Sequence, residues 1–329
     1  MSKQNILITG STGFVGRHVV RKLAPNQDLR LICIVRGGER HPQANFLLKE
    51  GAILVRGEFY GETILKKVFE QYPIRQVIHL AAIRGARNTS PEEFRQVNVE
   101  GTALLLRQAY EHGVQKFVHC SSVGVYGTIP LAVPAGIETP LRGDTQYHKS
   151  KVAAEEAVRE YIQKGLNAYI VRATIAYGSG DEGFPQTLVR LVRRHLLWLP
   201  KTNHQVHLVD VERVAEVFLN LIVRDRFPQR IFLATDAEPV PLKDLVDWIH
   251  WYFYGRPYPR FLQLPDWMFE LAYHLFQGLG NEKWAVRLAL ICKDWYFQSA
   301  DTYRMLGIQP ASTREAFGRF LRESPAFQT

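Results

Sequence analysis

Short apolar runs alternate with amphipathic segments along the first half of the chain. Helical periodicity predicts helices over Phe14–Leu23, Pro91–His112 and Tyr147–Tyr161. The apolar runs between them predict buried strands at Asn5–Thr9, Leu29–Val35, Ile53–Val55, Val77–Leu80, Lys116–Cys120 and Ala168–Arg172. Continuous apolar strands that alternate with helices are typical of a parallel sheet covered on both faces. The pattern predicts an α/β fold, a doubly wound parallel sheet of the Rossmann type.

The regular alternation ends after Tyr177. A helix is expected over Phe184–Leu197, and short strands at His207–Asp210 and Ile231–Ala234 are expected to return to the sheet. From Pro239 onward the pattern is mainly helical and rich in aromatic residues. We therefore expect a larger domain of residues 1–174, to which 206–236 return. Residues 175–205 and 237–329 form a smaller, mainly helical part.

Composition and charge exclude several classes of protein. The net charge is +9, but the Lys and Arg residues are scattered, so we expect no nucleic-acid partner. The three cysteines are far apart and odd in number, which indicates neither a metal site nor a disulfide framework. The N-terminus lacks a signal-peptide pattern, and no run offers the roughly 18 apolar residues of a spanning helix. A cytoplasmic location is therefore expected.

Three glycines, Gly10, Gly13 and Gly16, follow the first predicted strand and open the first helix. Glycines let the backbone turn tightly and approach a pyrophosphate, and a helix N-terminus supplies free N–H groups and a favourable dipole. The loop therefore predicts a dinucleotide site, although a purely structural turn would use the same residues. Residues 1–174 are then the NAD(P)-binding domain, and the smaller part binds the substrate.

The second strand ends at Val35, and Arg36 follows it. A NAD-selective site normally has Asp or Glu there to bind the ribose hydroxyls, whereas Arg suits a 2′-phosphate. Arg36 is permanently charged and can bind phosphate through two hydrogen bonds. The sequence therefore favours NADP(H), and Glu39 keeps NAD(H) open.

Tyr147 and Lys151 are four residues apart on a predicted helix and so share one face. A free tyrosine has a pKa near 10, and lowering it by about three units requires roughly 4 kcal/mol of preference for the phenolate. The Lys151 ammonium and an oxidised nicotinamide ring could supply that preference. Ser122 follows the fifth strand, where doubly wound folds bind ligands, and its hydroxyl could hold a substrate oxygen.

These motifs, in this order, resemble the extended short-chain dehydrogenase/reductases of the NAD(P)-dependent epimerase/dehydratase superfamily. The resemblance runs from Ile6 to about Val214 and includes His79–Ala82, Asn98–Thr102 and Arg172–Gly178. It implies that Tyr147 is the general acid/base. The cofactor would be bound by Gly10, Thr12, Gly13, Phe14, Val15, Gly16, Arg36, Glu58, Leu80, Ala81, Ala82, Tyr147, Lys151 and Ile175.

The resemblance also gives roles to three polar residues around Tyr147. Lys151 would bind the nicotinamide ribose and lower the pKa of the tyrosine, and Ser122 would orient the substrate oxygen. Asn98 would support the active-site helix and a proton relay, although it could simply cap or fix a helix. We expect His79 to be a packing residue at the end of its strand. Glu58 stands where many relatives have Asp beside the adenine.

The family contains reductases, dehydrogenases, sugar-nucleotide epimerases and dehydratases. Val123–Gly124 stands where dehydratases resemble one another in an acidic pair, which argues against a dehydratase. Gln205–His207 lacks the arginine common in sugar-nucleotide epimerases, and so resembles the branch of 3β-hydroxysteroid dehydrogenases and dihydroflavonol reductases. We therefore expect an oxidoreductase that transfers hydride to or from a carbonyl or secondary alcohol of a mainly apolar small molecule. An NDP-sugar epimerase with bound NAD and a non-catalytic NADP-binding scaffold or sensor are the alternatives.

Aromatic residues are dense between Trp248 and Phe297. They could line an apolar substrate pocket, form the core of a helical lobe, or make a face that touches a membrane surface. Peripheral membrane contact is therefore expected as an alternative to a purely cytoplasmic location. The resemblance further implies a homodimer, whose interface would use the helices that carry Asn98 and Tyr147.

Overall fold

The computed structural model describes residues 3–84 and 89–328. The chain divides into two compact units, which we describe one at a time. The first unit comprises Met1–Val125, Leu141–Ala173 and Val214–Phe232. The second comprises Tyr126–Pro140, Thr174–Arg213 and Leu233–Thr329.

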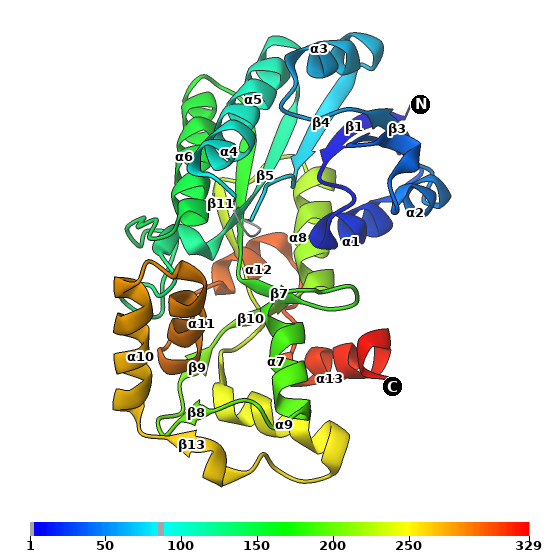
Figure 1. Ribbon diagram of the computed structural model, residues 1–329. Coiled ribbons are helices and arrows are strands. Elements are labelled where there is room, and N and C mark those ends of the chain that lie inside the picture. Colours follow the sequence, from blue (N-terminus) through cyan, green and yellow to red (C-terminus); the bar gives the residue numbers. More distant parts are fainter. Residues whose placement is uncertain (1–2, 85–88, 329) are drawn as a thin grey trace. The chain divides into compact units, whose positions relative to one another are not determined.

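A seven-stranded parallel sheet forms the centre of the first unit, with strand order β11-β6-β5-β4-β1-β2-β3 (Figure 1). The chain builds β1 to β3 outward in one direction, then returns to place β4 on the other side of β1. Ligands of such sheets bind beyond the carboxyl ends of the strands at this reversal. The strands are β1 (Gln4–Thr9), β2 (Leu29–Val35), β3 (Ile53–Arg56), β4 (Ile74–His79), β5 (Lys116–Ser122), β6 (Ala168–Ala173) and β11 (Ile231–Ala234).

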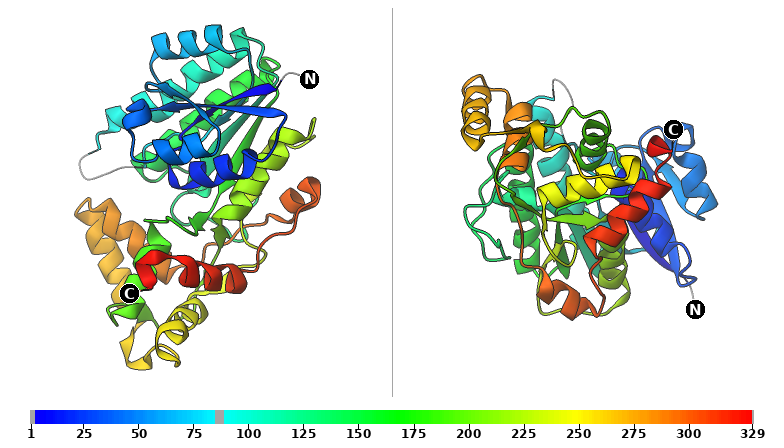
Figure 2. Two further views of the ribbon diagram at one scale, coloured as in Figure 1. Left: turned by 90° about the vertical axis from the view of Figure 1, so that its right-hand side faces the viewer. Right: turned by 90° about the horizontal axis from the view of Figure 1, so that it is seen from below.

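Helices cover both faces of this sheet (Figures 1 and 2). Buried side chains of α3, α5 and α6 pack with the sheet into one apolar core, which includes Leu65, Leu105 and Val158. Helices α1 and α8 lie on the opposite face (Figure 1). The expected Rossmann-type architecture is confirmed. The helices are α1 (Phe14–Leu23), α2 (Ala44–Lys49), α3 (Glu62–Gln71), α4 (Pro91–Phe94), α5 (Gly101–Glu111), α6 (Gln146–Gln163) and α8 (Val211–Val223).

Two expected helices differ from the structure. The helix predicted over Pro91–His112 is interrupted between α4 and α5 by a π-helical turn, Arg95–Glu100. The helix predicted over Phe184–Leu197 ends at Arg193, because His195 takes the left-handed backbone conformation with φ of 54°. That conformation cannot continue a right-handed helix.

The second unit is mainly helical. Its short strands form three pairs: β7 with β10, β8 with β13, and β9 with β12. Helix α7 packs on α9, and α10 packs on α11. The strands are β7 (Ile175–Tyr177), β8 (Leu199–Pro200), β9 (Gln205–Val206), β10 (Leu208–Asp210), β12 (Val240–Pro241) and β13 (Gln263–Leu264). The helices are α7 (Phe184–Arg193), α9 (Leu242–Tyr254), α10 (Asp266–Gly278), α11 (Glu282–Cys292), α12 (Ala300–Leu306) and α13 (Thr313–Glu323).

Candidate active site

The loop between β1 and α1 is packed so closely that only glycine fits at two positions. Gly10 has φ of 74°, and a Cβ atom there would lie 2.5 Å from the backbone nitrogen of Ala81. A Cβ atom on Gly16 would lie 2.0 Å from the carbonyl oxygen of Gly10. The loop is therefore a tight backbone cradle between the carboxyl ends of β1 and β4.

The first turn of α1 presents backbone N–H groups at this cradle. The N-cap residue, Gly13, offers no side-chain cap, and the first turn contains no acidic residue. The N–H groups of Phe14, Val15 and Gly16 belong to the part of a helix that has no intrahelical acceptor. Half-buried Thr12 lies just before them. Unopposed N–H groups and the positive end of the helix dipole fit the pyrophosphate of a dinucleotide.

Charged residues stand at the ends of β2 and β3, where an adenosine ribose would lie. Arg36 follows β2 and is exposed, and Gly37 and Gly38 after it both have positive φ angles. Glu58 is also exposed and hydrogen-bonds the phenol of Tyr60. The pKa of Tyr60 is raised by burial first and then by this bond to Glu58, while the positive charge of Arg36 opposes the shift. The charges of Arg36 and Glu58 therefore both act on Tyr60.

His79, which we expected to be a packing residue, forms the centre of a buried hydrogen-bond chain. Its Nδ1 lies 2.6 Å from Thr9 Oγ1, and its Nε2 lies 2.8 Å from Thr102 Oγ1. Thr102 Oγ1 donates to the carbonyl oxygen of Asn98 at 2.6 Å, so it must accept from His79 Nε2–H. The Thr9 hydroxyl then donates to Nδ1 and also accepts from the backbone N–H of Ala81 at 3.4 Å.

This chain of hydrogen bonds fixes the position of the segment that follows β4. The backbone N–H of Leu80 donates to the carbonyl oxygen of Thr9 at 3.1 Å, and Ala81 and Ala82 follow directly beside the glycine cradle. Burial first, and the positive charge of Lys151 second, lower the pKa of His79 to about 3. The imidazole is therefore neutral at physiological pH and acts as a positioning group rather than as a proton carrier.

Asn98 lies in the π-helical turn and connects two segments of the site. Its Oδ1 accepts from the backbone N–H of Ile83 at 2.9 Å, and its Nδ2 donates to the carbonyl oxygen of Ile83 at 2.9 Å. Nδ2 also donates to Ser150 Oγ at 2.9 Å, and Ser150 Oγ donates to the carbonyl oxygen of Tyr147 at 2.7 Å. Asn98 therefore holds the loop after β4 against the first turn of α6.

Tyr147, Lys151 and Ser122 come together where α6 passes the end of β5. Thr145 caps α6 by accepting from the backbone N–H of His148 at 3.1 Å, which sets the start of the helix. Lys151 Nζ donates to the carbonyl oxygen of Cys120 at 2.6 Å, and the side chains of Tyr147 and Ser122 are hydrogen-bonded. Three of the expected catalytic side chains are thus gathered at one edge of the sheet.

A model of the NAD dependent epimerase/dehydratase family matches residues 6–232. The chain belongs to this family. The matched region includes the glycine cradle, the turn with Asn98 and the group around Tyr147. Members of this family are NAD-dependent enzymes.

Individual relatives differ in the reaction that their names give. The chain is 28% identical over 252 residues to the UDP-glucose 4-epimerase of Vibrio cholerae, covering 74% of each protein. It is 26% identical over 243 residues to a 4-hydroxy-2-methyl-3-oxo-4-farnesyl-3,4-dihydroquinoline-1-oxide ketoreductase of Stigmatella aurantiaca, covering 73% of this chain and 70% of that one. Among similar UDP-glucose 4-epimerases, the match spans between 49% and 74% of the relative's length.

Solved structures show the same fold over nearly the whole chain. The Bordetella bronchiseptica enzyme WbmG, crystallised with NAD, superposes with a TM-score of 0.74 and 17% identity. The alignment covers 98% of this chain and 94% of WbmG. At this identity the similarity establishes the fold.

The protein's own groups raise the pKa of Tyr147, and the lowering expected with an oxidised nicotinamide ring stays a prediction. Burial first, and the neighbouring Cys120 second, raise the pKa of Tyr147, which reaches about 12. Arg84 and the hydrogen bond from Ser122 act in the opposite direction but do not outweigh burial. Burial also lowers the pKa of Lys151. The protein's own groups therefore keep Tyr147 protonated at neutral pH, in the form that can donate a proton.

One expected cofactor ligand belongs to the second unit. Ile175 begins β7 and is paired with Leu208 of β10. Its place in that unit is well defined, and its role toward a cofactor stays a prediction. Within residues 3–84 and 89–328, no group of three or more His, Cys, Asp and Glu side chains is arranged to hold a metal ion. In the same ranges, no helix has the length and apolar character needed to cross a membrane.

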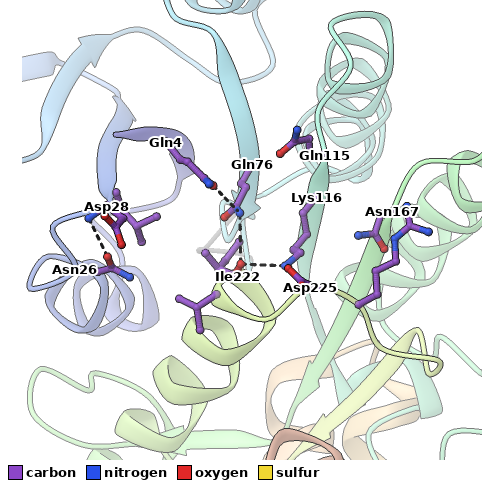
Figure 3. A pocket seen from close by; sticks show the side chains of 12 residues that line it. Gln4, Asn26, Asp28, Gln76, Gln115, Lys116, Asn167, Ile222 and Asp225 are labelled. Carbon is purple, nitrogen blue, oxygen red and sulfur yellow. Dashed lines mark hydrogen bonds between the residues drawn. The ribbon is translucent and has the colours of Figure 1, made fainter. Parts of the chain in front are cut away.

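A polar cavity of about 580 Å³ lies at the opposite, amino-terminal edge of the sheet (Figure 3). Lys116 Nζ and Gln76 Nε2 both point to the carbonyl oxygen of Ile222, at 2.9 and 3.4 Å. Burial lowers the pKa of Lys116, and the nearby charge of Asp225 opposes that shift. Both side chains satisfy carbonyl groups at the end of α8, so the cavity's most buried polar groups support the fold.

Proposed function

We propose that the protein is an NAD(P)-dependent reductase or dehydrogenase that acts on a carbonyl or secondary alcohol of a mainly apolar small molecule. The observation that carries this proposal is the group at the end of β5, where Tyr147 is hydrogen-bonded to Ser122 and Lys151 to the carbonyl oxygen of Cys120. A reduced nicotinamide cofactor supplies hydride when bound. In that direction, Ser122 holds the substrate oxygen and Tyr147 donates its proton to it.

Lys151 and Asn98 are the positioning residues of this group. Lys151 is anchored by its bond to the carbonyl oxygen of Cys120, which directs the ammonium group toward the end of β5. Asn98 fixes the backbone of Tyr147, because Ser150 accepts from Asn98 and donates to the carbonyl oxygen of Tyr147. Positioning of this kind lowers the entropic cost of proton transfer.

An NDP-sugar epimerase is the second candidate, and the similarity to the Vibrio cholerae UDP-glucose 4-epimerase favours it. The similarity to the Stigmatella ketoreductase, and the absence of arginine in Gln205–His207, support the reductase. The two differ in how they use the cofactor, because an epimerase transfers hydride out and back with no net consumption. A reductase must release and replace its cofactor in every turnover.

Cofactor exchange therefore tests the proposal. The purified protein is denatured, and the released nucleotide is identified and counted; a second sample is first incubated with excess NADPH. A reductase gives little retained nucleotide and exchanges freely with NADPH. About one equivalent of NAD that survives incubation and is released only on denaturation would overturn the reductase assignment in favour of the epimerase.

We further propose that NADP(H) is preferred, because Arg36 stands exposed at the end of β2 where an acidic residue would serve NAD. Hydrogen bonds to a charged group contribute about 1.5–3 kcal/mol, so Arg36→Ala should weaken NADPH binding roughly 10- to 100-fold. NADH affinity should change by less than about threefold, since NADH has no 2′-phosphate. Arg75→Ala is the matched control, because Arg75 is also exposed but stands at the amino-terminal end of β4. Equal losses of affinity for NADPH and NADH in Arg36→Ala would refute the preference for NADP(H).

A further inference from the structure

Helix α10 and the residue that caps its end expose a row of large apolar side chains. Trp267, Leu271, Leu275 and Leu279 are spaced four residues apart, and their exposed fractions are 62%, 63%, 58% and 71%. Residues at this spacing lie on one side of a helix. We call these four residues the α10 face. Large apolar side chains scattered singly on a surface are ordinary, but a continuous row of this size indicates a partner.

The other side of the same helix is already occupied within the second unit. Phe269 is buried, Phe276 stacks on Trp284 of α11 at 6.0 Å, and the ring of Tyr273 lies 4.8 Å beneath Lys293 Nζ. Packing on α11 therefore explains the inner apolar residues but not the outer ones. A surface helix normally has polar residues on its outer side, so α10 departs from the usual pattern.

The acidic groups of α10 lie beside the α10 face rather than on it. Asp266 turns to Thr202, whose backbone N–H and hydroxyl both donate to its carboxylate at 3.0 Å. At 100° per residue, Glu270 and Gln277 fall on the flank of the helix. A protein partner usually meets hydrogen-bonding groups and arginine or tyrosine anchors within an interface. Exposed His274 lies at the edge of the α10 face near Trp267, but the four side chains of the face carry no charge, as expected for contact with lipid.

Aromatic and basic residues lie at both ends of the α10 face. Before it, Phe261 is 79% exposed and follows Arg260, which is also paired with Asp247 at 2.9 Å. After it, Trp284 stacks on Phe276 but stays 47% exposed, and the guanidinium of Arg287 lies 5.2 Å from its ring. Lys283 is also exposed there. Exposed aromatic side chains and cations around an apolar stripe are the features that hold a helix at the interface of an anionic bilayer. The net charge of +9 adds long-range attraction to such a surface.

From these features we infer that the second unit binds the surface of an anionic membrane through the α10 face. The contact is peripheral, since α10 has 13 residues and would lie in the plane of the interface. It depends on neither the cofactor nor the reaction, so it can fail or hold independently of the proposed function.

Vesicle flotation tests this inference with the full chain. The vesicles contain either phosphatidylcholine alone or phosphatidylcholine with about one third phosphatidylglycerol. The wild type should float with the anionic vesicles, and should do so less at high salt because screening weakens the cationic contribution. Leu271→Asp combined with Leu275→Asp should lower the partition coefficient by on the order of 100-fold, since each leucine contributes about one decade.

The matched control is Leu48→Asp combined with Leu131→Asp. These leucines are 44% and 66% exposed and lie outside α10, so the control adds the same two charges elsewhere. It should bind vesicles within about threefold of the wild type. Circular dichroism and NADPH binding verify that each variant is folded. Equal flotation of both double variants, or no flotation of the wild type, would overturn the inference. So would a wild-type oligomer in lipid-free gel filtration that only the α10 variant dissociates, because the face would then be a self-association interface.

Discussion

Gly16→Ala tests the glycine cradle directly. The added Cβ atom would lie 2.0 Å from the carbonyl oxygen of Gly10 and 2.8 Å from Ser11 Cα. Ordinary contacts of this kind begin at 3.4 Å, so the two backbone segments must separate by about 1.4 Å. All the clashing atoms are backbone, so no side chain can rotate away. The segment that must move is the one expected to contact the pyrophosphate.

A displacement of about 1 Å at a ligand-positioning group can lower a reaction rate on the order of 100-fold, and a similar loss is expected for nucleotide affinity. We therefore expect Gly16→Ala to weaken the binding of both NADH and NADPH by at least that factor. Overpacking should also destabilise the first unit by about 1–3 kcal/mol. Gly13→Ala should have a smaller effect, because its Cβ atom would meet only the carbonyl oxygen of Gly10, at 3.3 Å.

Nicotinamide fluorescence titration, accompanied by thermal denaturation, measures both effects. Gly318→Ala is the control: it lies within α13, and its Cβ atom would meet only the flexible guanidinium of Arg322, at 3.4 Å. It should leave nucleotide binding unchanged and stabilise the helix by up to about 1 kcal/mol. If Gly16→Ala folds and binds both nucleotides as tightly as the wild type does, the cradle is not the cofactor site.

Two further predictions concern buried carboxylates. Burial raises the pKa of Asp236 to about 7. The folded protein therefore keeps a proton on Asp236 that the unfolded chain loses above about pH 4. The free energy of unfolding is for this reason greatest at low pH and decreases as the pH rises through 7. Between pH 5 and 8 the free energy of unfolding should fall by about 3 kcal/mol. Urea unfolding of Asp236→Asn should show no such pH dependence. The same pH dependence in Asp236→Asn as in the wild type would refute the raised pKa of Asp236. Glu155 and Arg172 form a fully buried pair with bonds of 2.6 and 2.9 Å, so Glu155→Gln should lower the free energy of unfolding by about 3–5 kcal/mol, and a loss below 1 kcal/mol would contradict a charge-dependent role.

The sequence predicted the strands of the sheet and its first helix because local signals mark their ends, but the strand expected to return at His207–Asp210 pairs with β7 outside the seven-stranded sheet. The bounds of α1 and β2 coincide with the predicted segments, since glycines precede the helix and Arg36 follows the strand. The interruption at Arg95–Glu100 carries no such signal. It is stabilised by contacts of Asn98 with Ile83 and of Thr102 with the Asn98 carbonyl, and hydrophobic periodicity cannot register hydrogen bonds of this kind.

The same limit applies to the candidate site. Tyr147, Lys151 and Ser122 could be selected by spacing, but the link from Asn98 through Ser150 to Tyr147 needs three-dimensional contacts. His79 appeared to be a packing residue because its partners, Thr9 and Thr102, are distant in sequence. Likewise, burial, which no motif encodes, raises the pKa of Tyr147, so the lowering expected from Lys151 and an oxidised nicotinamide ring stays a prediction.

The most direct test of the proposed function follows a single hydride. NADPH carrying deuterium at the transferred position is incubated with a panel of apolar ketones, and the products are analysed by mass spectrometry. We predict one deuterium on the carbinol carbon for each NADP+ formed. Tyr147→Phe should bind NADPH normally and turn over about 100- to 10,000-fold more slowly. Full turnover by Tyr147→Phe would contradict the acid/base role, and interconversion of UDP-sugars by the wild type without NADPH consumption would contradict the reductase itself.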